Sequence, residues 1–345
     1  MEPDKYMDTI HFLGEEDFRS AMDHENKTWR DNCVTKGSIT SFDGTRLNYY
    51  IADPQGITEQ NSEYPDPTVS ITIVHGLGEF FAKYYEYAWY LNQAGCKVFF
   101  LEQRGHGYSE GKMPEPDLVY IDDYATYVED LNIFTNQIVI PQSKSMPRLV
   151  LAHSMGGAVT TRFLEMHPEV FQAAILSSPM LKMKAGNINR FVETILRIYV
   201  ALFGLNKKLA FNQKRFNPNP VFETSSARSR ARFDYQLKFR REDEHYQTTG
   251  VTFGWALASI KVHRDIFKDI DKIRIPIDLF TAGQDHLIDP AGYELFAQKV
   301  NDLRIHPYEN SRHEIFNSDD NDREKYFSEV IKIINGYQPP LFLSF

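Results

Sequence analysis

Residues 149–157 restrict the possible folds more than any other stretch of the chain. They run LVLAHSMGG, an apolar segment that breaks at Ser154 between small residues. A serine on a sharp turn from a strand into a helix projects its hydroxyl group outward, and bulky neighbours would clash at such a turn. The pattern predicts a nucleophile elbow, with Ala152 standing where the usual pentapeptide has its first glycine. It therefore predicts a serine hydrolase whose nucleophile is Ser154.

Strand and helix patterns alternate on both sides of this turn. An alternating run at 38–52 predicts a β-hairpin, and short apolar or β-branched runs predict strands at 69–74, 97–101, 148–151, 173–177, 277–281 and 303–307. Helical patterns lie between or after them at 84–94, 120–140, 155–167, 291–300 and 323–336. This order predicts an α/β fold built on a doubly wound, mostly parallel sheet.

The alternation stops between Pro179 and Thr252. The gap is far longer than the roughly 2–6 residues that usually join elements of such a sheet. We therefore predict a helical cap at 180–252, inserted between two strands of a catalytic core formed by 38–179 and 253–345. Residues 1–37 are then an N-terminal extension.

Charge is divided unevenly along the chain. The formal net charge of -9 disfavours nucleic-acid binding, yet residues 181–245 carry fourteen Lys and Arg against six Asp and Glu. The predicted cap is thus basic and the remainder acidic. We expect the basic cap to contact an anionic membrane surface. Nothing in the sequence indicates an oligomeric state.

The expected location is the cytoplasm. Cys33 and Cys96 have no paired spacing, which indicates a reducing compartment rather than a disulfide framework. The first thirty residues lack the regions of a signal peptide, and no stretch reaches the roughly 18 apolar residues of a spanning helix.

A serine hydroxyl group needs a base to remove its proton and a third group to orient that base. Asp285 and His313 follow Ser154 in the order that such a sheet supplies, each in a loop after a predicted strand. We predict Asp285 as the acid and His313 as the base.

Four other side chains compete for these two roles. Asp289 precedes Pro290 and is more typical of a helix cap, whereas Asp278 lies inside a predicted strand. His306 lies on a strand, and His286 adjoins the predicted acid.

Acyl transfer also needs backbone N–H groups that are in place before negative charge develops. The segment HGLGE at 75–79 directly follows a predicted strand, and its glycines permit a tight turn. We predict that the Leu77 and Met155 N–H groups form the oxyanion hole. The segment RGHGYS at 104–109 forms a second tight turn, in which we interpret His106 as structural.

Motifs for cofactors and metals are missing from the sequence. It contains no Walker loop, no G-x-G-x-x-G segment after a strand, and no H-E-x-x-H or Cys/His set. We expect neither an organic cofactor nor a metal ion.

Five motifs together resemble those of a known family. The monoacylglycerol lipase and lysophospholipase branch of the serine α/β-hydrolases has motifs similar to VHGLGE, LEQRGHGYSEG, LAHSMGGAV, TAGQDHLIDP and SRHEIF. The resemblance implies an α/β-hydrolase fold with the catalytic and oxyanion residues already predicted. The inserted segment is similar to the cap of bacterial lysophospholipases, and the family implies peripheral association with the inner bacterial membrane. One departure is Glu102, where the family often has Asp.

A lysophospholipid presents one acyl chain and an anionic phosphate, so its site needs an apolar slot and nearby cations. Phe191 and Ile195 belong to an apolar stripe at helical spacing, and Arg228 and Arg232 lie further along the cap. We predict that these four residues and Gly76 bind substrate. The alternative is that the stripe is the core of the cap and that the charges face solvent.

These inferences predict an enzyme that releases a fatty acid from lysophospholipids through an acyl-enzyme on Ser154. The alternatives are a monoacylglycerol lipase or carboxylesterase, a lysophospholipid acyltransferase, and a non-hydrolytic lipid-binding protein on the same fold. The apolar C-terminal tail at 341–345 is either packed on the body or a further membrane contact.

Overall fold

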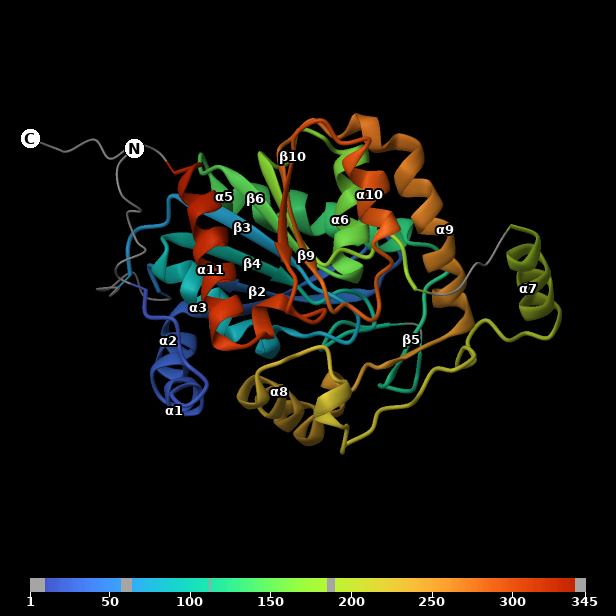
Figure 1. The fold of residues 1–345 in the computed structure, drawn as a ribbon, viewed down its shortest axis with the longest axis horizontal. Coiled ribbons are helices and arrows are strands. Elements are labelled where there is room, and N and C mark those ends of the chain that lie inside the picture. Colours follow the sequence, from blue (N-terminus) through green and yellow to red (C-terminus); the bar gives the residue numbers. More distant parts are fainter. Residues whose placement is uncertain (1–9, 57–63, 112, 185–189, 339–345) are drawn as a thin grey trace, which may run out of the picture.

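One central sheet organises the protein (Figure 1). This computed structural model describes residues 10–56, 64–111, 113–184 and 190–338, so the C-terminal tail at 341–345 lies outside the described residues. Eight strands lie side by side in the order β1-β2-β4-β3-β6-β7-β9-β10. They are β1 (Val34–Thr40), β2 (Arg46–Ala52), β3 (Val69–Val74), β4 (Cys96–Leu101), β6 (Arg148–His153), β7 (Ala173–Ser177), β9 (Ile277–Ala282) and β10 (Leu303–Tyr308). Only the β1–β2 and β2–β4 pairs are antiparallel, which confirms the mostly parallel sheet.

The central strands are buried on both faces, as parallel strands covered by helices require. All six residues of β3 are buried. In β6, Leu149 and Leu151 join the core on one face, whereas Val150 and Ala152 join the core on the other. Successive side chains therefore serve two separate hydrophobic layers.

Helices cover each face of the sheet. One core layer includes residues of α1 (Phe18–Asp23), α2 (Glu25–Cys33), α3 (Tyr85–Gln93) and α11 (Asp320–Asn335). The opposite layer includes residues of α4 (Ala125–Phe134), α6 (Met155–Met166), α9 (Phe253–Asp269) and α10 (Ala291–Ala297). The predicted α/β-hydrolase fold is thus confirmed, with α1 and α2 as additions within the N-terminal extension that the sequence analysis left unassigned.

Two predicted boundaries differ by four or more residues from those observed. The predicted helix at 120–140 begins only at Ala125 and continues past α4 through a π-helical turn, η3 (Thr135–Val139), into α5 (Ile140–Ser143). The first strand begins at Val34 rather than at residue 38, because its first four residues also pair with β2.

The chain between β7 and α9 lies outside the two helical layers (Figure 1). It holds α7 (Arg190–Leu202), η4 (Phe222–Thr224), α8 (Arg230–Glu242), η5 (Glu244–Tyr246) and β8 (Gly250–Val251). β8 pairs in parallel with β5 (Leu118–Val119), which anchors the end of this segment to the core. We call residues 180–252 the cap. The division of the chain into extension, core and cap stays a prediction.

Ion pairs join the basic cap to the acidic core. Over the ranges that the structure describes, a cap cation pairs with a core carboxylate at four places: Lys182 with Asp289, Arg215 with Asp117, Arg228 with Asp319, and Arg232 with Glu86. In a fifth pair the charges are reversed, with Arg264 of the core and Glu193 of the cap. Part of the charge asymmetry of the sequence is therefore used to join the cap to the core. Among the described residues, no helix has both the length and the apolar character needed to cross a membrane.

The N-terminal extension also contacts the cap. One carboxylate oxygen of Glu15 accepts the Ala231 N–H at 2.6 Å, and the other accepts the Ser229 hydroxyl at 2.5 Å. Because Ser229 is the N-cap of α8, Glu15 supports the start of that helix from outside the cap. Phe18 packs edge-on against Tyr235 of α8, with ring centroids 5.3 Å apart.

Candidate active site

Ser154 stands on the turn between β6 and α6. Its backbone has φ 52° and ψ -119°, a left-handed conformation that costs a non-glycine residue on the order of 1–3 kcal/mol. A side chain at Gly156 would collide with the Val74 carbonyl, and one at Gly157 would collide with Pro179. The small residues of the sequence motif are therefore required by close backbone packing.

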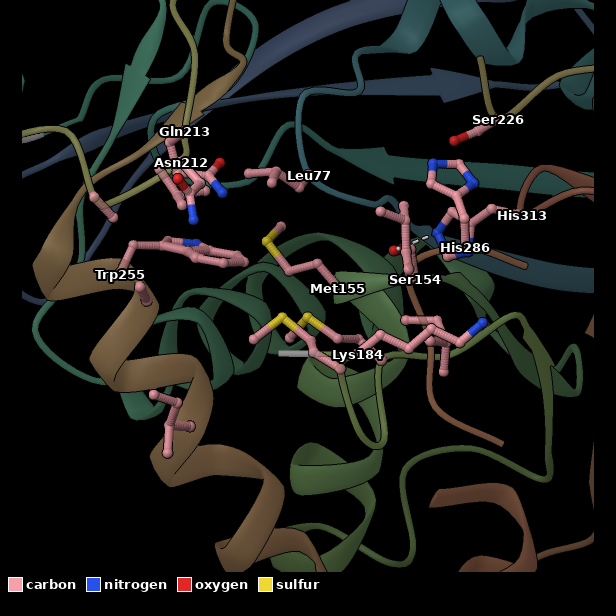
Figure 2. A pocket seen from close by; sticks show the side chains of 18 of the residues that line it. Leu77, Ser154, Met155, Lys184, Asn212, Gln213, Ser226, Trp255, His286 and His313 are labelled. Atoms are coloured by element: carbon pink, nitrogen blue, oxygen red, sulfur yellow. Dashed lines mark hydrogen bonds between the residues drawn. The ribbon is translucent and has the colours of Figure 1, made fainter. Parts of the chain in front are cut away.

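The structure brings Ser154, His313 and Asp285 into one hydrogen-bonded chain. His313 Nε2 lies 2.8 Å from Ser154 Oγ, a contact drawn as a dashed line in Figure 2, and His313 Nδ1 lies 2.6 Å from Asp285 Oδ2. The serine comes from the β6–α6 turn, the acid from the loop after β9, and the histidine from the loop after β10. Parallel strands place these loops at one edge of the sheet, as the predicted order requires.

Asp285 is held as a carboxylate. Its Oδ1 atom accepts the N–H groups of Leu287 at 2.8 Å and Ile288 at 3.1 Å. Burial raises the pKa of Asp285, but the contact with His313 and these two N–H groups outweigh burial and lower it overall. Lys184 Nζ also donates to the Asp285 carbonyl at 2.5 Å, which fixes the loop that carries the acid.

The competing acids and bases have other partners. Asp278 binds Arg304 and His306 on the neighbouring strand. Asp289 pairs with Lys182 and caps the Ala291 N–H.

Neither His286 nor His106 takes the position of the catalytic base. His286 lines the same pocket as Ser154, yet the hydrogen bond to the serine comes from His313. His106 is buried with Nδ1 against the Arg104 carbonyl, and burial lowers its pKa to about 3, which fits a structural role.

The Leu77 and Met155 N–H groups are available to a ligand. Within the part of the chain that the structure describes, neither donates to a protein acceptor. Met155 is the first residue of α6, where a helix leaves its N–H groups without partners. Both residues line the pocket that contains Ser154, and their role as an oxyanion hole stays a prediction.

A buried charged cluster supports this loop and was not predicted. Lys83 Nζ lies 2.7 Å from both Glu79 Oε1 and Glu314 Oε1. Glu79 also accepts the Gly76 N–H and lies 3.0 Å from His153 Nδ1. Burial raises the pKa of Glu79, but His153 and Lys83 outweigh burial and lower it well below its usual range. The i, i+4 spacing of Glu79 and Lys83 was the available sequence signal.

A pocket of about 660 Å³ opens from Ser154. Figure 2 shows Ser154 and His313 on one side and Trp255 of α9 on the other. Its wall is mainly apolar, with Met180, Met183, Leu196, Phe253, Trp255, Leu257 and Ile260 among its residues. Its size and apolar wall suit one extended hydrocarbon chain better than a polar substrate.

Three of the residues predicted to bind substrate lie elsewhere. Phe191 is 73% exposed and Ile195 is 51% exposed, whereas their neighbour Leu196 lines the pocket. The helical face was therefore misassigned by one residue, which rotates a side chain by about 100° around the axis. Gly76 is outside the pocket wall, because its N–H binds Glu79 and its carbonyl faces His75 Nδ1.

The two predicted cap arginines are also committed elsewhere. Arg232 is buried and forms an ion pair with Glu86, so its prediction as a substrate-binding cation is wrong. Arg228 pairs with Asp319 at 3.1 Å and donates to the Asn310 carbonyl. Both cations dock the cap on the core rather than face the pocket.

Comparison with known proteins now defines the family. A family model described as "Serine aminopeptidase, S33" (Hydrolase_4) matches residues 65–320. The chain belongs to this family. Lysophospholipase L2 of Escherichia coli (strain K12) is 27% identical over 336 residues, which cover 92% of this chain and 98% of the relative. Monoacylglycerol lipase of Mycolicibacterium smegmatis is 26% identical over 282 residues, or 81% of this chain and 90% of that protein.

Solved structures of other hydrolases share the fold. A thermostable carboxyl esterase from Bacillus coagulans superposes with a TM-score of 0.70 at 20% identity, covering 88% of this chain and 99% of the esterase. The predicted likeness to the lysophospholipase and monoacylglycerol lipase branch is confirmed, and so is the predicted enzyme class, a serine hydrolase.

Proposed function

We propose that this enzyme hydrolyses the acyl ester of lysophospholipids through an acyl-enzyme on Ser154. The observation that carries the proposal is the hydrogen-bonded Ser154–His313–Asp285 chain at the mouth of a long apolar pocket. The relative from E. coli, named lysophospholipase L2, matches nearly its whole length to this chain and supports the same substrate class.

In the first half of the reaction, Ser154 Oγ attacks the ester carbonyl carbon while His313 Nε2 takes the serine proton. The carbonyl oxygen becomes an oxyanion that accepts the Leu77 and Met155 N–H groups. Asp285 orients His313 and stabilises its positive charge. When the tetrahedral intermediate collapses, the ester C–O bond breaks and His313 gives the proton to the departing alcohol. In a lysophospholipid this alcohol is the glycerol that carries the phosphate headgroup.

In the second half, water replaces the alcohol. His313 takes a proton from the water as its oxygen attacks the acyl-enzyme carbonyl, and the second tetrahedral intermediate releases the fatty acid. The proton passes to Ser154 Oγ, which restores the free enzyme. The apolar pocket holds the acyl chain through both steps and so keeps the carbonyl beside the oxyanion donors.

Monoacylglycerol hydrolysis is the second candidate. The apolar pocket would accept the same acyl chain, and the relative from M. smegmatis is named monoacylglycerol lipase. An acyltransferase would share the acyl-enzyme but pass the acyl group to a lipid alcohol, so product analysis with and without an acceptor separates transfer from hydrolysis.

For membrane contact, we propose the outer face of α7 in place of the basic charges of the cap. Large apolar side chains are exposed there: Phe191, Val192, Ile195, Ile198, Tyr199 and Leu202, followed by Phe203. An amphipathic helix of this kind lies at a lipid surface with its apolar face in the acyl region. Contact of α7 with a membrane would bring the pocket close to lipid substrates. A cytoplasmic location with peripheral membrane contact stays a prediction.

The deciding experiment is a panel of substrates with one acyl chain: lysophosphatidylethanolamine, lysophosphatidylglycerol, monoacylglycerol and a p-nitrophenyl ester. We expect release of fatty acid from the lysophospholipids with the highest kcat/KM. Ser154→Ala should abolish hydrolysis of all four, whereas Ser145→Ala, on an exposed turn, should leave it unchanged. A wild-type enzyme that cleaves monoacylglycerol but no lysophospholipid would overturn the proposal.

A further inference from the structure

A second cavity lies next to the apolar pocket. Its volume is about 260 Å³, and it shares Leu77, Ser226 and Glu314 with the pocket that contains Ser154. Figure 2 shows Ser226 on the His313 side of the site, away from Trp255. The two cavities therefore meet beside the catalytic side chains.

The wall of this second cavity differs in chemistry from that of the first. Many of the side chains that line it are polar: Lys83, Ser225, Ser226, Gln236, Arg240, Thr248 and Thr249. Three charged groups face it. Lys83 and Glu314 are paired with each other, which leaves Arg240 as a separate cation.

Arg240 is bound only by neutral groups. Its Nε atom donates to the Tyr246 carbonyl at 3.0 Å, and its Nη2 atom donates to the Thr248 carbonyl at 2.9 Å, to the Gln247 carbonyl at 3.4 Å and to Thr249 Oγ1. Its guanidinium also lies over the Phe216 ring, 5.0 Å from the centroid. Nη1 has no acceptor among the residues that the structure describes.

Arg240 is half-buried, and its arrangement differs from that of the buried guanidinium groups in this molecule. Arg104, Arg232 and Arg323 are buried, and each has a carboxylate partner within 4.0 Å. Arg240 has none within the described ranges. Burial lowers the pKa of Arg240 to about 10, so the side chain remains a cation at neutral pH. Glu314, in the same cavity wall, acts on Arg240 from beyond ion-pair distance and is itself paired with Lys83. A cation that is shielded from solvent and has no carboxylate in contact is costly, and an anionic ligand would lower that cost.

We propose that the second cavity binds the phosphate of a lysophospholipid headgroup, with Arg240 as the principal ligand. This inference rests on the proposed function and deepens it. Arg240 Nη1 points to no protein acceptor, so it is free to pair with a phosphate oxygen. The Gln236 amide is a further donor in the same wall, whereas the Thr249 hydroxyl already donates to the Gln247 carbonyl.

The positions of the two cavities match the parts of the substrate. With the ester at Ser154, the acyl chain occupies the apolar pocket toward Trp255, and the headgroup passes Leu77 and Ser226 into the polar cavity. A monoacylglycerol carries no phosphate and would leave Arg240 unpaired. Arg240 is thus a specificity-determining residue that favours lysophospholipids over neutral lipids.

The test compares Arg240→Gln and Arg240→Lys with the matched control Lys238→Gln. Lys238 is an exposed cation on the same helix, outside both cavities. For lysophosphatidylglycerol, we expect Arg240→Gln to lower kcat/KM roughly 10- to 100-fold, mainly through KM, and Arg240→Lys to lower it less. Hydrolysis of a monoacylglycerol with the same chain should change by less than about twofold in Lys238→Gln. The two Arg240 variants should lose much less kcat/KM with this monoacylglycerol than with lysophosphatidylglycerol.

A second measurement uses sn-glycerol 3-phosphate as an inhibitor of monoacylglycerol hydrolysis. We expect inhibition of the wild-type enzyme and of Lys238→Gln, and an inhibition constant raised about tenfold or more in Arg240→Gln. If lysophospholipids are not cleaved yet this Arg240-dependent inhibition is found, the proposed function fails and the phosphate site stands. An equal loss for both substrates, or inhibition unaffected by Arg240→Gln, overturns the inference.

Discussion

Arg232 and Glu86 form a bidentate ion pair that joins the cap to the core. Arg232 Nη2 lies 2.6 Å from Glu86 Oε1, and Arg232 Nε lies 2.8 Å from Glu86 Oε2. Arg232 belongs to α8 and Glu86 to α3, and both side chains are buried. Burial raises the pKa of Glu86, but Arg232 and Arg323 outweigh burial and lower it. The pair is thus fully charged inside the protein.

Removing this cation should destabilise the fold. We expect Arg232→Gln to lower the free energy of unfolding by about 3–5 kcal/mol, because Glu86 would lose its main buried partner. Urea titration measures the change. Arg230→Gln is the control, since Arg230 is exposed on the same helix and pairs only with Asp234. Equal stability of the two variants would contradict the docking role of Arg232.

The acid of the triad can be tested against its nearest competitor. We expect Asp285→Asn to lower kcat for ester hydrolysis about 10³–10⁴-fold, because His313 would lose the carboxylate that fixes its tautomer. Asp289→Asn should change kcat by less than about threefold, since Asp289 caps α10 at the surface. Steady-state kinetics on a p-nitrophenyl ester decides. The reverse ranking of the two variants would move the acid to Asp289.

Glu102 should make stability depend on pH. Burial raises its pKa to about 7 from an ordinary 4.5, so between these values the folded protein keeps a proton that the unfolded chain has lost. The contribution of Glu102 to stability therefore falls as pH rises through this window, by at most about 1.4 kcal/mol per pH unit, and levels off above it. His75, His106 and His263 contribute in the opposite direction below about pH 6.5, because burial lowers the pKa of each.

The matched variants for this effect are Glu102→Gln and Glu25→Gln. The stability of Glu102→Gln relative to wild type should rise with pH across this window, measured by urea unfolding at several pH values. Glu165, whose pKa burial raises to about 8, contributes equally to both proteins and cancels in this comparison. Glu25 is exposed, so its variant should keep the full wild-type slope. Identical slopes for Glu102→Gln and wild type would exclude Glu102 as the source.

The apolar face of α7 should govern binding to lipid vesicles. We expect the double variant Phe191→Ser with Leu202→Ser to bind phosphatidylcholine vesicles roughly 10-fold more weakly, because these side chains are 73% and 76% exposed. Val221→Ser is the control, as Val221 is an exposed apolar residue of the cap outside α7. Sedimentation with vesicles at low and high salt measures binding. Loss of binding at high salt with no effect of the α7 changes would favour the basic charges instead.

The sequence predicted the catalytic residues best, because each of them lies in a loop or turn directly linked to a strand. Ser154, Asp285 and His313 each follow a strand, so strand periodicity and chain order were enough to place them together. The strands at 69–74 and 173–177 have the predicted limits, because continuous burial on both faces leaves an uninterrupted apolar run.

The cap was harder to predict because its partners are distant in sequence. Arg232 and Glu86 are 146 residues apart, so the count of positive charges could not show which of them were neutralised by the core. The same limit applies to Arg240, whose significance lies in the absence of a carboxylate that only the fold can show. Phe191 and Ile195 were misassigned because helical spacing identifies a stripe without indicating what it faces.

The contact between Glu15 and the first turn of α8 bears on how far the chain can be shortened. A fragment starting at residue 38 would retain the nucleophile, acid and base. It would lose Glu15, whose carboxylate accepts the Ala231 N–H, and Phe18, whose ring packs against Tyr235. Arg240 lies on the same helix, α8, so the truncation should disturb the polar cavity more than the turn that carries Ser154. Such a truncated enzyme should still cleave simple esters while losing its preference among headgroups.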